Sequence, residues 1–174
     1  MILFGKPKRE PDRPVLRPEM TPIDWIMECV ALLGLLAFVG TMVYFFPRLP
    51  GRIPSHFDAA GYPDEWDGKS SLWGLAAIAF FIYTLLTLLN LIPHRFNFPV
   101  RITPNNALRQ YTMAIRLVRY LKGTLVWMFF YIQWSILRVA LFNSSGMGEW
   151  FLPVTIVIFL LPLIVYAVLS LKKS

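Results

Sequence analysis

The chain has 174 residues, of which 56% are hydrophobic and 16% charged, and its formal net charge is +7. Soluble domains average about 45–50% apolar and about 25% charged residues. This composition therefore excludes a globule exposed to water on all sides, and the chain must be covered by lipid or by partners. The basic residues lie between apolar runs rather than on one folded face, which excludes nucleic acid as the partner of the positive charge.

Residues 1–23 are predicted to form a basic, proline-rich cytoplasmic arm. Proline at the density found before Glu19 prevents a helix and favours an extended, solvated chain. Nothing in this stretch has the apolar core of a cleavable signal peptide. Thr21, Pro22 and Asp24 then have the pattern of a helix start, with a Thr N-cap, Pro at the first helical position and an acid three residues after the cap.

Residues 24–174 are predicted to form one all-α domain of four transmembrane helices. The expected helices cover about residues 24–46, 72–92, 105–142 and 150–171. A helix of about 23 residues is about 34 Å long, enough to cross about 30 Å of hydrocarbon. The first half of the third helix is amphipathic and is expected to extend into the cytoplasm. Pro162 is expected to kink the fourth helix.

The distribution of basic residues predicts the orientation. Of the 17 Lys and Arg residues, 13 lie in the arm, in residues 94–122 and in the tail, whereas three lie in residues 47–69. Cytoplasmic loops carry the excess of Lys and Arg. Both termini are therefore predicted to be cytoplasmic, and residues 47–69 to form an ordered extracytoplasmic loop.

The extracytoplasmic loop contains the first distinctive motif, LPGRIPSHFD at 49–58 followed by GYPDEW at 61–66. Prolines stiffen the chain and Gly61 provides a turn. Three interpretations apply to His56 and the nearby acids. A divalent metal suits imidazole and carboxylates, but the spacing is not that of a metal motif, so we expect none. The plainest interpretation is that His56 bonds the backbone of the loop while the acids are solvated.

The third interpretation is that the rigid loop recognises an extracytoplasmic peptide or partner, with Trp66 and Tyr62 as anchors. The candidate binding residues are those of the motif: Pro50, Arg52, Pro54, His56, Asp58, Gly61, Pro63, Asp64 and Trp66.

The second motif, NFPVRITPNNA at 97–107 followed by QY, precedes the third span. Its Asn side chains can cap backbone groups while Thr103 and Pro104 start the helix. The alternative, more specific interpretation is that this segment forms a repressor-binding surface. The candidate residues are Asn97, Pro99, Thr103, Asn106, Gln110 and Tyr111. The basic side chains that follow are expected to contact phospholipid headgroups: Arg109, Arg116, Arg119 and Lys122.

The two motifs resemble those of a bacterial membrane domain of unknown function. The first is similar to its LPxxIPxHxxxxGxPD signature, and the second to the NYPVxITxxNAxxQY segment of its stand-alone members, with Phe98 where Tyr is usual. This domain also forms the N-terminal part of SdpI-type immunity proteins, which protect a producing cell from a secreted toxin and can hold a repressor at the membrane. The resemblance implies a multi-pass protein of the bacterial cytoplasmic (inner) membrane, although SdpI-type proteins have further spans that this chain lacks.

Glu28 and Arg138 are ionisable residues inside expected spans. They lie near opposite ends of their helices, with depths that differ by about 15 Å, so each is expected to reach its own interface. Small residues are expected to mediate helix packing: Ala31, Gly34, Gly40, Gly74 and Ala77.

No nucleophile–base pair, phosphate loop or intramembrane His appears in the sequence, so we expect neither an enzyme nor a cofactor. Two functions remain from different classes. The first is a sensor-like or immunity-like protein whose loop recognises a peptide or partner. The alternative is an accessory structural subunit of a larger membrane protein complex.

Overall fold

A computed structural model describes residues 13–172 and shows a mostly helical fold. The four long helices are α1 (Pro22–Phe45), α2 (Ser71–Leu89), α3 (Ala107–Phe142) and α4 (Phe151–Leu171), with short 3-10 helices at Phe46–Arg48 and Pro93–Arg95. Each long helix has the length and apolar composition needed to cross a membrane, as the sequence predicted. The largest difference from the expected bounds is at the end of α2, which stops at Leu89 rather than at 92.

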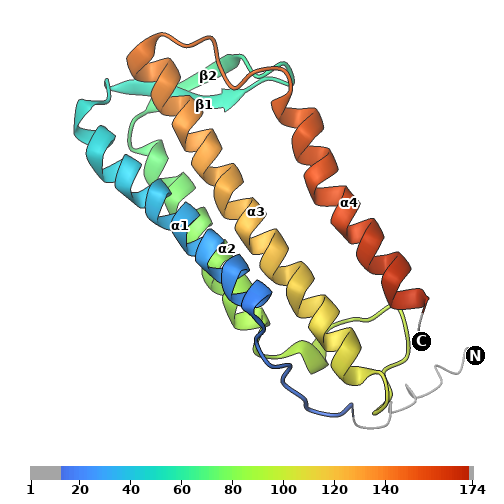
Figure 1. The fold of residues 1–174 in the computed structure, drawn as a ribbon. Helices are drawn as coiled ribbons and strands as arrows, with labels where there is room; N and C mark the ends of the chain where they lie inside the picture. Colours follow the sequence, from blue (N-terminus) through green and yellow to red (C-terminus); the bar gives the residue numbers. More distant parts are fainter. Residues whose placement is uncertain (1–12, 173–174) are drawn as a thin grey trace, which may run out of the picture.

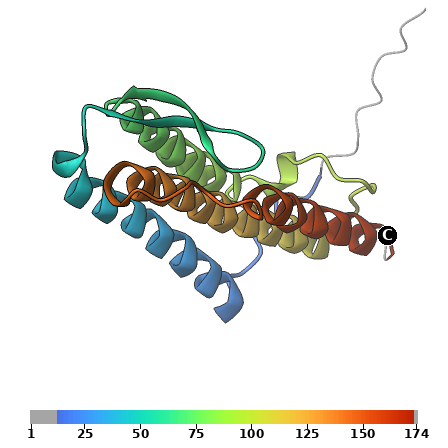
Figure 2. The same ribbon diagram turned by 90° about the horizontal axis from the view of Figure 1, so that it is seen from above.

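The central element is α3, which contacts each of the other three long helices. Helices α1 and α2 flank it on two sides, and α4 lies on a third (Figures 1 and 2). With 36 residues, α3 is about 54 Å long, so it is longer than the helices that flank it. Helix α4 is covered least, with Ser170 as its one fully buried residue. It runs uninterrupted through Pro162.

Close approach of α1 and α3 depends on small residues at the middle of α1. Ala31 is fully buried, and a Cβ on Gly34 would lie 3.0 Å from the Trp127 indole nitrogen. Small side chains let helix backbones approach closely in membranes, which the sequence predicted at these two positions. The same prediction is wrong for Gly40 and Gly74, because nothing lies within 4 Å of a Cβ built on either. Ala77 is exposed.

The loop between α1 and α2 contains a two-stranded antiparallel sheet, which was not among the elements predicted from the sequence. Strand β1 (Arg52–Phe57) pairs with β2 (Pro63–Gly68), and the register is irregular at Ser55 of β1 and at Asp64 of β2. The hairpin lies at the end of the bundle opposite the start of α1 and the end of α4 (Figure 1). The prolines of the hairpin and the lack of apolar alternation in β2 explain why the sequence did not indicate two strands.

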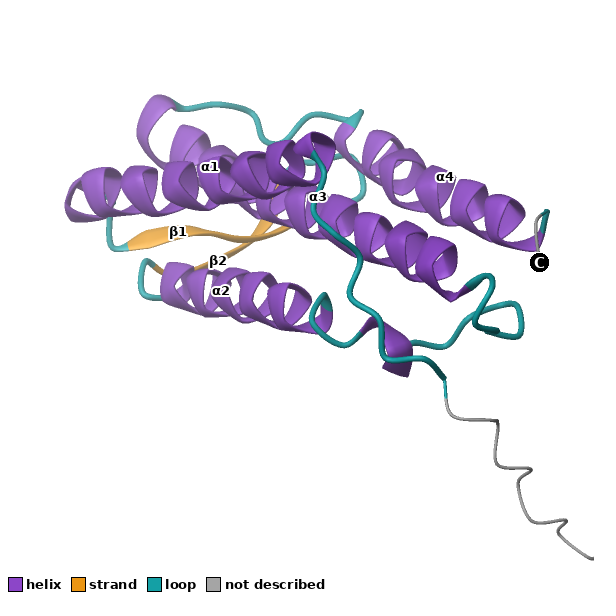
Figure 3. Cartoon of the chain, turned by 60° about the horizontal axis from the view of Figure 1, so that its bottom comes forward, coloured by secondary structure: helices purple, strands orange, loops and turns teal. Residues whose placement is uncertain are grey.

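The opposite end of the bundle holds the chain entering α1 and the connection from α2 to α3 (Figure 3). Residues 13–20 have no regular secondary structure, and the rest of the predicted arm, residues 1–12, lies outside the described residues. Arg13 donates a hydrogen bond to the Phe96 carbonyl (2.7 Å), and the Tyr111 hydroxyl donates to the Pro14 carbonyl (3.1 Å). The start of the described chain is thereby tied to the α2–α3 connection.

Candidate functional site

Apolar residues of the first motif hold the hairpin against the helices. Leu49 and Ile53 are buried in the same core as Leu72 and Leu137, and Pro54 is also fully buried. Each buried aliphatic side chain contributes about 1.5–3 kcal/mol, so these residues hold β1 firmly on the bundle. Pro54, predicted as a binding residue, therefore has a structural position.

Asp58 and Gly61 shape the turn that joins the strands. The Asp58 carboxylate accepts the backbone N–H groups of Ala60 (2.9 Å) and Tyr62 (2.8 Å), the pattern of an Asx turn. Gly61 has a φ of +83°, and its carbonyl accepts the Met147 N–H at 2.8 Å. The turn is thus fastened to the α3–α4 connection. Both residues fix the loop rather than present a free group.

The exposed part of the motif centres on a hydrogen-bonded histidine and aspartate, one from each strand. The His56 Nδ1 lies 2.6 Å from the Asp64 Oδ1, and the two side chains are 60% and 45% exposed. The hydrogen bond to Asp64, together with the negative charge of Asp64, Glu65 and Asp58, raises the pKa of His56 above its usual value. The expected bond from His56 to the loop backbone is replaced by this carboxylate.

Further polar and aromatic side chains surround the pair. Trp66 follows Asp64 by two positions on β2. Trp66 and Tyr62 are 41% and 58% exposed, and Arg52 donates to the Trp66 carbonyl at 2.7 Å. Of the other predicted residues, Pro50 is exposed and Pro63 half-buried. Within residues 13–172, no group of three or more His, Cys, Asp or Glu side chains is placed to hold a metal ion.

The second motif connects elements at the other end of the bundle. The Asn106 side chain accepts the Thr103 N–H (2.8 Å) and donates to the Arg101 carbonyl (3.0 Å). The helix begins at Ala107, not at Pro104 as expected, because residues 104–106 form a turn that Asn106 closes. Asn97 and Pro99 of this motif are exposed.

Gln110 joins α3 to the end of α4. Its side-chain oxygen accepts the Ser170 hydroxyl (2.7 Å), and its amide nitrogen donates to the Ser170 carbonyl (3.1 Å). Arg109, expected at lipid headgroups, donates to the Leu169 carbonyl at 2.7 Å. These contacts give the motif a role in packing of the helices.

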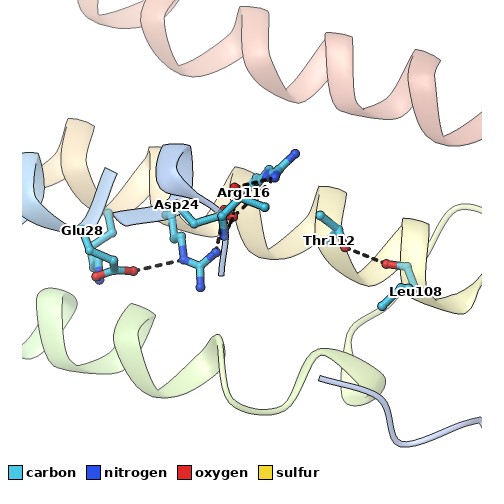
Figure 4. Close-up of polar contacts among 8 residues, drawn as sticks. Asp24, Glu28, Leu108, Thr112 and Arg116 are labelled. Carbon is cyan, nitrogen blue, oxygen red and sulfur yellow. Dashed lines mark hydrogen bonds and ion pairs between the residues drawn. The ribbon is translucent and has the colours of Figure 1, made fainter. Parts of the chain in front are cut away.

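A largely buried charge cluster joins α1 to α3 (Figure 4), and it was not among the features predicted from the sequence. Asp24 is 1% exposed and accepts hydrogen bonds from Arg116 (3.1 Å) and Arg119 (2.7 Å). Glu28 accepts from Arg119 at 3.2 Å and pairs with Lys122. These five residues are called the α1–α3 charge cluster below.

The cluster corrects the expectation for Glu28, which was expected to reach the interface by itself and instead pairs with Arg119 and Lys122. Arg116, Arg119 and Lys122, expected at lipid headgroups, have the acids of α1 as partners as well. Lys122 is fully buried, and its ammonium also contacts the Thr87 hydroxyl of α2 at 3.1 Å.

The spacing along the helices carried a signal for the cluster. Acids four residues apart on one helix and bases three apart on another form matching stripes. Arg138, the other ionisable residue assigned to a span, donates to the Gly146 carbonyl at 3.2 Å.

One comparison with known proteins identifies part of the chain. Residues 32–80 match the family model described as "Domain of unknown function (DUF1648)". The DUF1648 region runs from the middle of α1, through the hairpin, to the first half of α2. It includes the whole first motif and supports an uncharacterised domain there. Neither a curated protein nor a solved structure matches the chain.

Proposed function

We propose that this chain is a non-enzymatic, multi-pass protein of the bacterial inner membrane whose hairpin binds an extended, basic peptide outside the cytoplasm. The observation that carries the proposal is the exposed strand β2, which carries Asp64, Glu65 and Asp67 beside Trp66 and has one strand as neighbour.

Backbone geometry favours a peptide as the ligand. In a two-stranded sheet each strand has one edge without a neighbouring strand, and an extended peptide can add to such an edge through main-chain hydrogen bonds. The buried anchors Leu49 and Ile53 and the fastened turn hold β1 and β2 in place. A preorganised edge costs less conformational entropy on binding than a mobile loop.

Charge favours a basic peptide. The exposed strand β2 carries three carboxylates, and a basic residue of Arg or Lys type is absent from its six positions. Complementary charge raises association rates and selects against acidic partners. Trp66 and Tyr62 provide exposed aromatic area beside the carboxylates, the kind of side chain that anchors protein interfaces.

The non-enzymatic part of the proposal rests on the sequence, which has no recognisable nucleophile–base pair or phosphate loop. The orientation in this proposal rests on the excess of Lys and Arg at the other end of the bundle. The resemblance of the motif to SdpI-type immunity proteins suggests a secreted peptide as the ligand.

Two synthetic decapeptides test the proposal, one alternating Lys and Val and one alternating Glu and Val. The full chain in lipid nanodiscs should bind the Lys peptide and not the Glu peptide, as measured by calorimetry. Replacing both Asp64 and Asp67 by Asn should weaken binding about tenfold, since each exposed ion pair contributes up to about 1 kcal/mol.

Glu149→Gln is the matched control, because Glu149 is an exposed acid on the α3–α4 connection. It should leave the affinity unchanged. Equal binding of the two peptides, or equal losses in the Asn variant and the control, would contradict recognition by β2.

A further inference from the structure

A groove opens along one side of α3, between α1 and α4. Its volume is about 880 Å³, within the range of about 300–1,000 Å³ typical of small-molecule sites. Ile26 and Val30 form one wall and Ile158 and Phe159 the other, while Gly123 lies on the floor. Met147 and Trp150, next to the hairpin end, line it as well.

In a membrane, a groove in this position is exposed to lipid rather than to water. Both of its walls are helices long and apolar enough to cross a membrane. A lateral opening between two such helices faces hydrocarbon, where an acyl chain is the most abundant apolar occupant. Tyr120 and Trp127 contribute aromatic surface along the floor.

One side chain of the α1–α3 charge cluster, Arg119, lines the groove. The cluster contains three basic residues, Arg116, Arg119 and Lys122, and two acidic residues, Asp24 and Glu28. Its net formal charge is therefore +1.

An uncompensated positive charge is costly near a membrane interior, and an anionic headgroup compensates it. The Arg116 side chain is 39% exposed, so this end of the cluster is accessible to a phosphate. The net positive charge of the cluster should therefore favour binding of an anionic phospholipid over a zwitterionic one, which has no net charge.

We infer that the groove binds one anionic phospholipid, with an acyl chain between α1 and α4 and its phosphate at Arg119 and Arg116. The site is separate from the hairpin surface of the proposed function, and either can fail without the other. Bound there, the lipid fills the space that separates α4 from α1 and balances the charge of the cluster.

Native mass spectrometry of the full chain tests the inference, with phosphatidylglycerol and phosphatidylcholine of identical acyl chains as probes. The wild-type chain should retain one phosphatidylglycerol about fivefold more strongly than phosphatidylcholine, the preference expected from one basic residue near an anionic headgroup. Arg116→Gln makes the cluster neutral and should reduce this preference to none. Arg95→Gln removes an exposed charge at the same end of the bundle and should leave it unchanged.

A second pair of variants tests the groove itself. Thr155 lines the groove from α4, so Thr155→Trp should fill it and lower retention of both lipids several-fold. Val157 is 58% exposed on the same helix and lies outside the groove, so Val157→Trp should retain lipid like the wild type. If Thr155→Trp does not fold, Thr124→Trp places the same ring from the α3 side.

Three outcomes would overturn the inference. The first is equal retention of the two lipids by the wild-type chain. The second is unchanged retention in the groove-filling variant. The third is a wild-type dimer that Thr155→Trp abolishes, because a second copy of the chain would then occupy the groove.

Discussion

Asp24 shows how one residue can serve two structural purposes. Its carboxylate accepts the Thr21 N–H at 2.9 Å, as expected for a helix start, and also receives two guanidinium groups from α3. The helix start at Asp24 was predictable from the sequence, because helix capping is local and depends on neighbours three residues apart. The ion pair with Arg116 was not predictable, because Arg116 lies 92 positions away and only the packed helices bring it near.

The charge cluster leads to a prediction for Asp24→Asn. This substitution removes the anion from two guanidinium groups while Asp24 itself is almost fully buried. Breaking a buried pair by removing one partner typically costs about 3–5 kcal/mol, so the free energy of unfolding should fall by about 3 kcal/mol. Reversible unfolding by sodium dodecyl sulfate in mixed micelles measures it.

Asp67→Asn is the matched control for this substitution, because Asp67 is exposed on the hairpin. It should change stability by less than about 0.5 kcal/mol. A loss in Asp24→Asn no larger than in the control would mean that the cluster contributes nothing to stability.

His56 leads to a prediction about pH. Its folded-state pKa is raised by Asp64, so the folded state favours the charged imidazole. The pair therefore stabilises the hairpin fully below the unfolded pKa of about 6.5, and this contribution is lost as pH rises through the higher folded value. In His94→Gln, which leaves one imidazole, NMR titration should give a midpoint above about 6.5.

Adding Asp64→Asn to that variant should lower the midpoint, since it removes both the hydrogen bond and the negative charge. Ser55→Ala is a control on the same strand that keeps the pair intact. An unchanged midpoint after loss of Asp64 would show that the two side chains do not interact in solution.

At the scale of elements, the helices were predictable and the hairpin was not. The helices follow from long apolar runs ended by proline, as Pro47 and Pro93 illustrate. Strand β2 has the sequence PDEWDG, with mostly polar positions on both faces, so no alternation marked it as a strand. Its structure depends on pairing with β1, whose Ile53 and Pro54 are buried on the helices.

The fastening of the hairpin to the α3–α4 connection depends on Gly61. Its φ of +83° is unfavourable for residues with a side chain, and a Cβ there would lie 2.8 Å from the Gly148 carbonyl oxygen. Gly61→Ala should therefore destabilise this contact by about 2 kcal/mol. Hydrogen exchange of the Met147 amide, which donates to the Gly61 carbonyl, measures the loss directly.

Gly51→Ala is the control, because nothing lies within 4 Å of a Cβ at that position. It should leave the exchange of Met147 unchanged. Equal protection of this amide in both variants would show that the contact does not need glycine.

At the scale of the whole molecule, the sequence predicted the number of spans but not their arrangement. Hydropathy is a property of each segment alone, whereas the central position of α3 arises from contacts between segments. The candidate residues divide in the same way. His56 and Trp66 remain exposed at the hairpin, whereas Pro54 and Gln110 are buried and connect elements. Such a motif therefore contains two kinds of residue, those that stabilise the fold and those that are exposed on the surface.

The orientation of the molecule leads to the last prediction. The hairpin and the α2–α3 connection lie at opposite ends of the bundle (Figures 1 and 3), so they should face opposite sides of the membrane. The excess of Lys and Arg at the end with the α2–α3 connection predicts that this end is cytoplasmic. In a Cys29→Ser background, Ala59→Cys in the hairpin turn should react with a membrane-impermeant maleimide in intact spheroplasts.

Asn97→Cys is the matched position at the other end, and Asn97 and Ala59 are both exposed. It should react only after the membrane is permeabilised. The reverse pattern would place the hairpin in the cytoplasm, where a secreted peptide could not reach β2, and the proposed function would then fail. The lipid groove would survive that result, because its walls and its charge cluster depend on helix packing and not on which side each end faces.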